Sequence, residues 1–107
     1  GKNILMFSQC KIRVVRRSIN NELVHEYLAS PENFNICHKV EDHQEFLVEN
    51  PYKMPAGICP SAWADIRTYI IALASGSSFP FMKKDNSILT ICSDPFRPVI
   101  FLIERIE

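Results

Sequence analysis

One long helical pattern, from Pro60 or Ser61 to about Ser75, constrains the fold of this chain more than any other feature. Its apolar side chains recur at the spacing of one helix face. They are Ala62, Ile66, Tyr69, Ile70 and Leu73, with Ile71, Ala72 and Ala74 widening the stripe. The polar face consists only of Asp65, Arg67 and Thr68. We therefore expect a helix that is buried on most sides and that stops at Gly76.

Four other segments have the pattern of β-strands: 10–17, 44–49, 87–92 and 99–106. The first two alternate apolar and polar residues, which is typical of half-buried strands. The last contains Val99–Ile103, which is apolar on both faces, so we place it at the centre of the sheet. The sequence predicts an α+β fold, with a small three- to four-stranded, mainly antiparallel sheet packed against one long helix, plus a short helix.

The short helix is predicted from Glu22 to Leu28, because Asn20 or Asn21 can cap its first turn. The side chains expected to face inward are Leu23, Val24 and Tyr27. A chain of 107 residues has the size of one domain, so we predict a single domain over residues 1–107, with residues 1–9 as an N-terminal extension.

Composition narrows the class of protein. Twelve basic residues balance twelve acidic ones, which gives no basic face for general nucleic-acid binding, and 47% of the residues are hydrophobic. No segment has the length of a membrane span, so we expect no membrane partner. A core of this size needs no disulfide scaffold, and we expect a cytoplasmic protein with reduced thiols.

Four cysteines lie far apart, at Cys10, Cys37, Cys59 and Cys92, and no two form a C-x-x-C pair. Cys59 directly precedes the long helix, whose unpaired amides and dipole can lower the pKa of a thiol. Cys37 lies in a predicted loop and Cys92 ends a predicted strand. The alternative is that each of these cysteines is a small apolar residue of the core.

A metal site is one hypothesis for three of these thiols. Cys37, Cys59 and Cys92, with His38 or Asp94 as the fourth ligand, would suit tetrahedral zinc or an iron–sulfur cluster. A second hypothesis is a reversible disulfide, Cys37–Cys59 or Cys59–Cys92, with Cys59 as the catalytic attacking thiolate. Both require the three sulfurs to converge in space, which their separation along the chain neither implies nor forbids.

A series of short motifs covers the chain from about Lys11 to its end. After the mid-chain Cys37 come Gly-x-Cys-x-x-Ala-Trp-x-Asp-Ile at Gly57–Ile66, Cys-x-Asp at Cys92–Asp94, Arg-Pro-Val at Arg97–Val99 and Glu-Arg-Ile at Glu104–Ile106. This series resembles a family of small uncharacterised prokaryotic proteins. The resemblance implies the fold and the set Cys37, Cys59 and Cys92, with Cys10 outside the pattern, and it implies no activity.

One departure from that pattern concerns a turn. The family often has Gly-x-Glu-Phe before the second strand, where this chain has His43-Gln44-Glu45-Phe46, so the turn lacks the residue that adopts positive φ most easily.

The segment Phe79–Met82 contains three large apolar residues in a predicted loop, which either cap the core or dock a partner. Our first hypothesis is a non-enzymatic accessory or binding module, a homo-oligomer or bound to a partner protein, that carries the thiolate metal site. The second is a thiol-dependent redox enzyme or sensor that uses Cys59.

Overall fold

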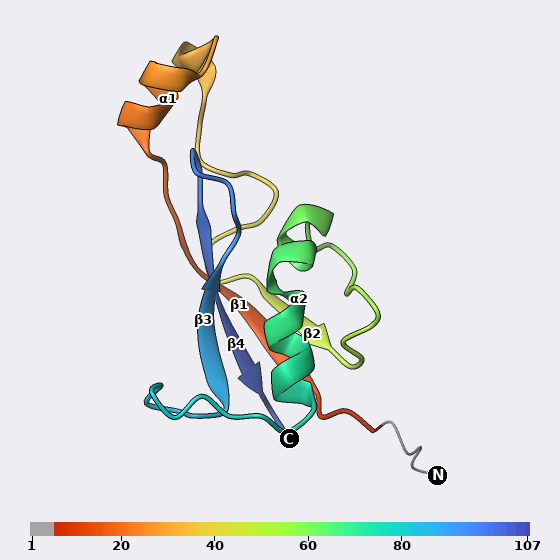
Figure 1. Ribbon diagram of the computed structural model, residues 1–107. Coiled ribbons are helices and arrows are strands. Elements are labelled where there is room, and N and C mark those ends of the chain that lie inside the picture. The colour runs from red at the N-terminus through yellow and green to blue at the C-terminus, as the bar shows by residue number, and fades with distance from the viewer. Residues whose placement is uncertain (1–5) are drawn as a thin grey trace.

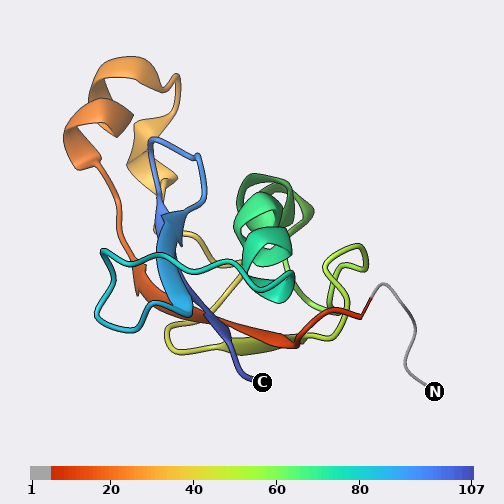
Figure 2. The ribbon, with the colours of Figure 1, turned by 60° about the horizontal axis from the view of Figure 1, so that its bottom comes forward.

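The computed structural model describes residues 6–107, and its sheet contains four strands whose neighbours all pair antiparallel. The elements in chain order are β1 (Cys10–Arg17), α1 (Asn21–Tyr27), the 3₁₀ turn η1 (Pro31–Asn33), β2 (Glu45–Val48), α2 (Pro60–Ala74), β3 (Ser87–Ile91) and β4 (Val99–Arg105). The strand order is β2-β1-β4-β3. Figures 1 and 2 show α2 along one face of this sheet. The predicted α+β fold, with one long and one short helix, is confirmed.

The core lies between α2 and the sheet face that it covers. Alternate side chains of each strand point to this face, since the side-chain period of a strand is two. Ile12 of β1 stands opposite Phe46 on one side and Ile103 on the other, and all three are buried. From α2, Ile66, Ile70 and Leu73 are fully buried against them.

β4 occupies the central position predicted from its apolar run, between β1 and β3. Its inward residues Val99, Phe101 and Ile103 are buried, whereas Ile100 and Leu102 on the other face are only half-buried. The face of the sheet away from α2 is therefore incompletely covered.

The covered side of α2 is narrower than predicted. Thr68 is exposed, as its place on the polar face indicated, but Ala64 is exposed as well, and Tyr69, which was expected to face the core, is 39% exposed. The helix packs on a single sheet, so only one side of it can be covered. Its end does occur where Gly76 predicted it: Ser77 N–H donates to the Ala72 carbonyl at 2.9 Å and Gly76 N–H to Leu73 at 3.0 Å, the pattern of a Schellman cap.

The inward face of α1 also differs from the prediction. Val24 is buried, but Leu23 and Tyr27 are 37% and 67% exposed. Among the helices and strands, α1 packs only against η1, and Figure 1 shows the two projecting beyond the sheet. A two-turn helix in that position can bury only a narrow stripe, and the predicted stripe was too wide.

The turn before β2 places His43 in the left-handed region, with φ of 67°. His43 N–H donates to the Val14 carbonyl at 3.0 Å, and Val14 N–H donates to Gln44 at 2.9 Å, so the turn extends the pairing of β1 with the segment before β2. We expect His43→Gly to raise the free energy of unfolding by about 0.5–1 kcal/mol. The left-handed conformation costs about 1–2 kcal/mol for a residue with a Cβ, and glycine avoids this cost. The more flexible unfolded chain of the glycine variant offsets about 0.5–1 kcal/mol of that gain.

Urea denaturation measures this change, and Gly76→Ala is the matched control. Gly76 has φ of 99°, and nothing lies within 4 Å of an added Cβ, so backbone strain alone should destabilise that variant, by about 1 kcal/mol. A His43→Gly variant that is less stable than the parent chain would contradict the prediction.

Across residues 6–107, no helix has both the length and the apolar character needed to cross a membrane.

Candidate thiol site

Three cysteines from separate segments line one cavity of about 300 Å³. Cys37 comes from the loop after η1, Cys59 from the residue before α2, and Cys92 from the residue after β3. The other lining residues are Lys39, Ser61, Asp65, Ser93, Asp94 and Arg97. The structure thus brings together the three thiols that the sequence singled out, and all are free thiols.

Cys59 occupies the N-cap position of α2, in an extended conformation that lets its carbonyl accept the Trp63 N–H at 2.9 Å. Its thiol makes no capping hydrogen bond. The backbone amide of Ala62 nevertheless favours the thiolate and lowers the pKa of Cys59, and the Ser61 amide, the Lys39 charge and the Ser61 hydroxyl add to this effect against the opposing effect of burial. Cys59 is therefore the thiol of this cavity that is poised to ionise.

Cys92 has the opposite character. Burial is the largest cause of its raised pKa, and the charges of Asp65, Asp94 and Cys37 raise it further, although the Asp94 amide opposes them. The raised pKa favours the protonated Cys92 thiol, in the same cavity as Cys59, whose pKa is lowered.

Arg17 fixes the loop that carries Cys37. Its guanidinium donates to the Cys37 carbonyl at 2.8 Å, to the Val40 carbonyl at 3.0 Å and to the Asp42 carboxylate at 2.9 Å. Its bond to Asp42 also holds the pKa of that exposed carboxyl below its usual range. Three hydrogen bonds donated by one side chain at the end of β1 tie a loop without regular structure to that strand.

Asp65 fixes the segment that carries Cys92. One carboxylate oxygen accepts both the backbone N–H of Ser93 at 2.8 Å and its hydroxyl at 2.9 Å, which ties the second turn of α2 to the end of β3. Within the turn, Asp94 accepts the N–H of Phe96 at 2.9 Å and pairs with the Arg97 guanidinium at 3.5 Å. Both cysteine-bearing segments are therefore held by several polar contacts, of which those of Arg17 to the Cys37 and Val40 carbonyls and of Asp94 to Phe96 are partly buried.

The remaining candidates lie elsewhere. Cys10 is fully buried on the inward face of β1, and burial raises its pKa to about 11, so it is a core residue. His38 is exposed and does not line the cavity, whereas Asp94 does. Over residues 6–107, no three His, Cys, Asp or Glu side chains are arranged to hold a metal ion. The side chains as they lie do not fit the zinc or iron–sulfur site.

Several residues of the site were missed from sequence. Lys39, Ser61 and Ser93 line the cavity, and Arg17 holds one of its walls. Ser61 had a signal, since it follows Cys59 in the first turn of the predicted helix. Arg17 had no such signal in the sequence, because its hydrogen-bond partners lie in a distant segment of the chain.

Comparisons with protein-family models, with curated proteins and with solved structures gave no match.

The pKa order of these thiols predicts their order of alkylation. Because only the thiolate reacts, we expect iodoacetamide at pH 7 to modify Cys59 on the order of tenfold faster than Cys92, with Cys10 protected in the folded protein. The midpoint of the pH profile for Cys59 should lie below the usual value of about 8.5. Timed alkylation followed by peptide mass spectrometry gives the rate at each cysteine, and faster reaction at Cys92 would contradict the assignment.

Proposed function

We propose that this protein is a thiol redox protein in which Cys59 is the attacking thiolate and Cys37 or Cys92 is the resolving thiol. One observation carries the proposal: two further thiols line the same cavity as a cysteine whose pKa is lowered by the amides of a helix start. Cys59 supplies the nucleophile, and the second thiol supplies the group that can displace a bound product.

The substrate class is a disulfide. The Cys59 thiolate attacks one sulfur of the substrate, forming a Cys59–substrate mixed disulfide and breaking the substrate's S–S bond, and the other substrate sulfur leaves as a thiolate. The resolving thiol gives its proton to that thiolate and attacks the Cys59 sulfur. The second substrate thiolate then leaves and takes a proton from water, which replaces the proton that Cys59 released on ionising, and a disulfide remains within the protein. Two electrons pass from the two cysteines to the substrate, which is reduced to two thiols.

The electrostatics suit this order of events. A lowered pKa at Cys59 supplies the attacking thiolate near neutral pH, and a raised pKa at Cys92 keeps its proton until the first product thiolate can accept it. The reaction begins from reduced thiols, which agrees with a cytoplasmic location.

The competing proposal is the metal module on Cys37, Cys59 and Cys92, with Asp94 as a fourth ligand. The shared cavity supports it too, but within residues 6–107 no three such side chains are arranged to hold an ion, so the ligands would have to rearrange to form zinc–sulfur bonds of about 2.3 Å. The redox proposal asks only that two of the three thiols approach during the reaction.

Oxidised glutathione tests the redox proposal directly. Reduced protein, purified without oxygen and analysed for zinc and iron, is mixed with excess oxidised glutathione at pH 7, then quenched in acid and digested. We expect an intramolecular disulfide that links Cys59 to Cys37 or to Cys92, with two equivalents of glutathione released.

Two results would overturn the proposal. One is a disulfide that excludes Cys59, or no disulfide under conditions in which the protein stays folded. The other is one zinc or iron bound per chain that shields all three cysteines from oxidation, which would establish the metal module instead.

A further inference from the structure

The sheet face opposite α2 is open, and its side chains come from all four strands. Cross-strand pairing places Leu89 beside Leu102 and Ile91 beside Ile100 on this face. Leu89 and Ile91 are each 50% exposed, and Leu47 on β2 is 49% exposed. Among residues 6–107, Figures 1 and 2 show no helix over this side of the sheet. Leu89, Ile91, Ile100 and Leu102 thus form an exposed apolar floor on β3 and β4, which is a feature of interaction surfaces. Lys11 and Arg13 of β1 lie between this floor and Leu47.

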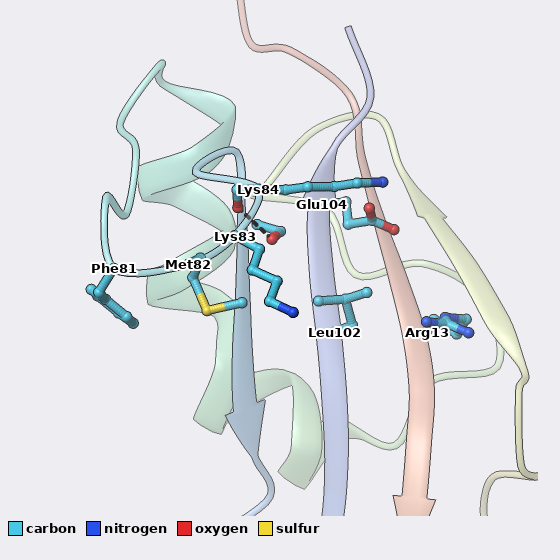
Figure 3. A pocket seen from close by; sticks show the side chains of 8 residues that line it. Arg13, Phe81, Met82, Lys83, Lys84, Leu102 and Glu104 are labelled. Carbon is cyan, nitrogen blue, oxygen red and sulfur yellow. Dashed lines mark hydrogen bonds between the residues drawn. The ribbon is translucent and has the colours of Figure 1, made fainter.

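A shallow cavity of about 580 Å³ lies at one end of this floor, where the loop after α2 returns to β3. Its lining consists of Arg13, Phe81, Met82, Lys83, Lys84, Ser87, Leu102 and Glu104. Figure 3 shows Met82 and Lys83 pointing toward Leu102, with Arg13 on the far side of β4. The Ser87 hydroxyl donates to the Lys84 carbonyl at 2.7 Å, which anchors the loop to β3 (Figure 3).

The Phe79–Met82 loop has features of both predicted roles, a cap on the core and an exposed docking group. Phe79 and Met82 pack against the core, whereas Phe81 is 76% exposed. Phe81 is nevertheless held in an edge-to-face contact with Phe79, with ring centroids 6.0 Å apart. A fixed aromatic side chain at the rim of the cavity is a suitable anchor for a partner.

Charge decides what kind of partner fits. On the open face, Lys11 pairs with both Glu45 at 3.6 Å and Glu104 at 3.9 Å, so this one lysine compensates one of the two negative charges. Within residues 6–107, Arg13, Arg16, Lys83 and Lys84 form no ion pair. A chain with no net charge therefore presents four unpaired cations around one apolar floor.

We propose that the open sheet face, hereafter the Leu89 face (Leu47, Leu89, Ile91, Ile100 and Leu102 with Arg13, Arg16, Lys83 and Lys84), binds an acidic amphipathic segment of a partner protein. The apolar side of such a segment covers the leucine and isoleucine side chains, and its carboxylates pair with the surrounding cations. The face shares no lining residue with the thiol cavity, so the proposal does not depend on the redox function.

A second copy of this chain fits less well. A two-fold contact would place the same patch against itself, and the four cations of one copy would then face those of the other. A membrane surface fits less well too, because the leucine and isoleucine side chains lie in the sheet face and only Phe81 stands out at its rim.

The probe is a fluorescein-labelled synthetic helix of about 18 residues, with leucine along one face and glutamate at the other positions. A twin peptide with lysine in place of every glutamate is the charge control. Fluorescence anisotropy at low ionic strength should show binding of the glutamate peptide and not of the lysine twin. We expect the double variant R13E/K83E, and separately L89S, to weaken this binding about tenfold or more, and added salt to weaken it as well.

The matched control is Lys39→Glu, which changes the charge of an exposed lysine at the thiol cavity, whose lining shares no residue with the Leu89 face, and should leave peptide binding unchanged. Circular dichroism verifies that each variant is folded, and Arg13→Gln with Lys83→Gln replaces any charge reversal that is not.

Each remaining outcome overturns the proposal. These outcomes are no binding of the glutamate peptide, equal binding of the lysine twin, or binding that L89S and R13E/K83E leave unchanged. Sedimentation that shows a dimer broken by L89S would assign the face to a second copy. Binding to phosphatidylserine vesicles without binding to the peptide would assign it to a lipid surface.

Discussion

Cys59→Ser is expected to abolish reduction of oxidised glutathione, with a rate at least about a hundredfold below that of the parent protein. A serine hydroxyl stays protonated where the Cys59 thiol ionises, so the variant lacks the nucleophile that opens the substrate disulfide. The α2 N-terminus is retained, because serine is a better N-cap than cysteine, and the variant should be at least as stable as the parent chain. Release of glutathione thiol, followed with a thiol-specific dye, measures the rate.

The other cysteines provide the controls. A variant that lacks the resolving thiol, Cys37→Ser or Cys92→Ser, should accumulate the mixed disulfide of Cys59 with glutathione, which adds one glutathione to the intact mass. Cys10→Ala removes a thiol from the core and should leave the rate of exchange unchanged at a temperature where it is folded. Full activity in Cys59→Ser, or loss of activity in Cys10→Ala alone, would contradict the assigned roles.

The regular elements were predictable because each is encoded within a single segment. The alternation in 10–17 and the apolar run from Val99 to Ile103 carry their own period, and the predicted strands became β1 and the central β4. Pro60 and Gly76 bracket α2 through local effects on φ and on the capping of its ends.

The predictions of which helix residues are buried were wrong where burial depends on elements distant in the sequence. Tyr69 matches the helical period of α2 but lies beyond the edge of the covered side, since only one sheet packs on that helix. Leu23 and Tyr27 have the same pattern on α1, yet no sheet face is near enough to cover them. Periodicity shows which residues share a face, but not how wide the covered part of that face is.

The three cysteines of the candidate cavity could be named from sequence, but their convergence and most of the other lining residues could not. Sequence identified Cys59 from the adjacent helix start, and it detached Cys10. Convergence depends on contacts between segments far apart in the chain: Arg17 holds the loop of Cys37, and Asp65 holds Ser93 next to Cys92. Single hydrogen bonds of this kind leave no periodic trace in a sequence.

Phe101→Ala is expected to lower the free energy of unfolding by about 3–5 kcal/mol, because the truncated ring leaves a cavity in a packed core. Phe101 is fully buried in the middle of β4, opposite Val14 and Thr90 on the two neighbouring strands. A domain of this size has a total stability of about 5–15 kcal/mol, so a large share of that stability is lost.

Leu102→Ala is the matched control, since Leu102 is the next residue on the same strand, is half-buried and points to the open face. Its loss should be about 1 kcal/mol. Urea denaturation of both variants gives the comparison. Equal losses would mean that the open face is as thoroughly buried in solution as the face beneath α2.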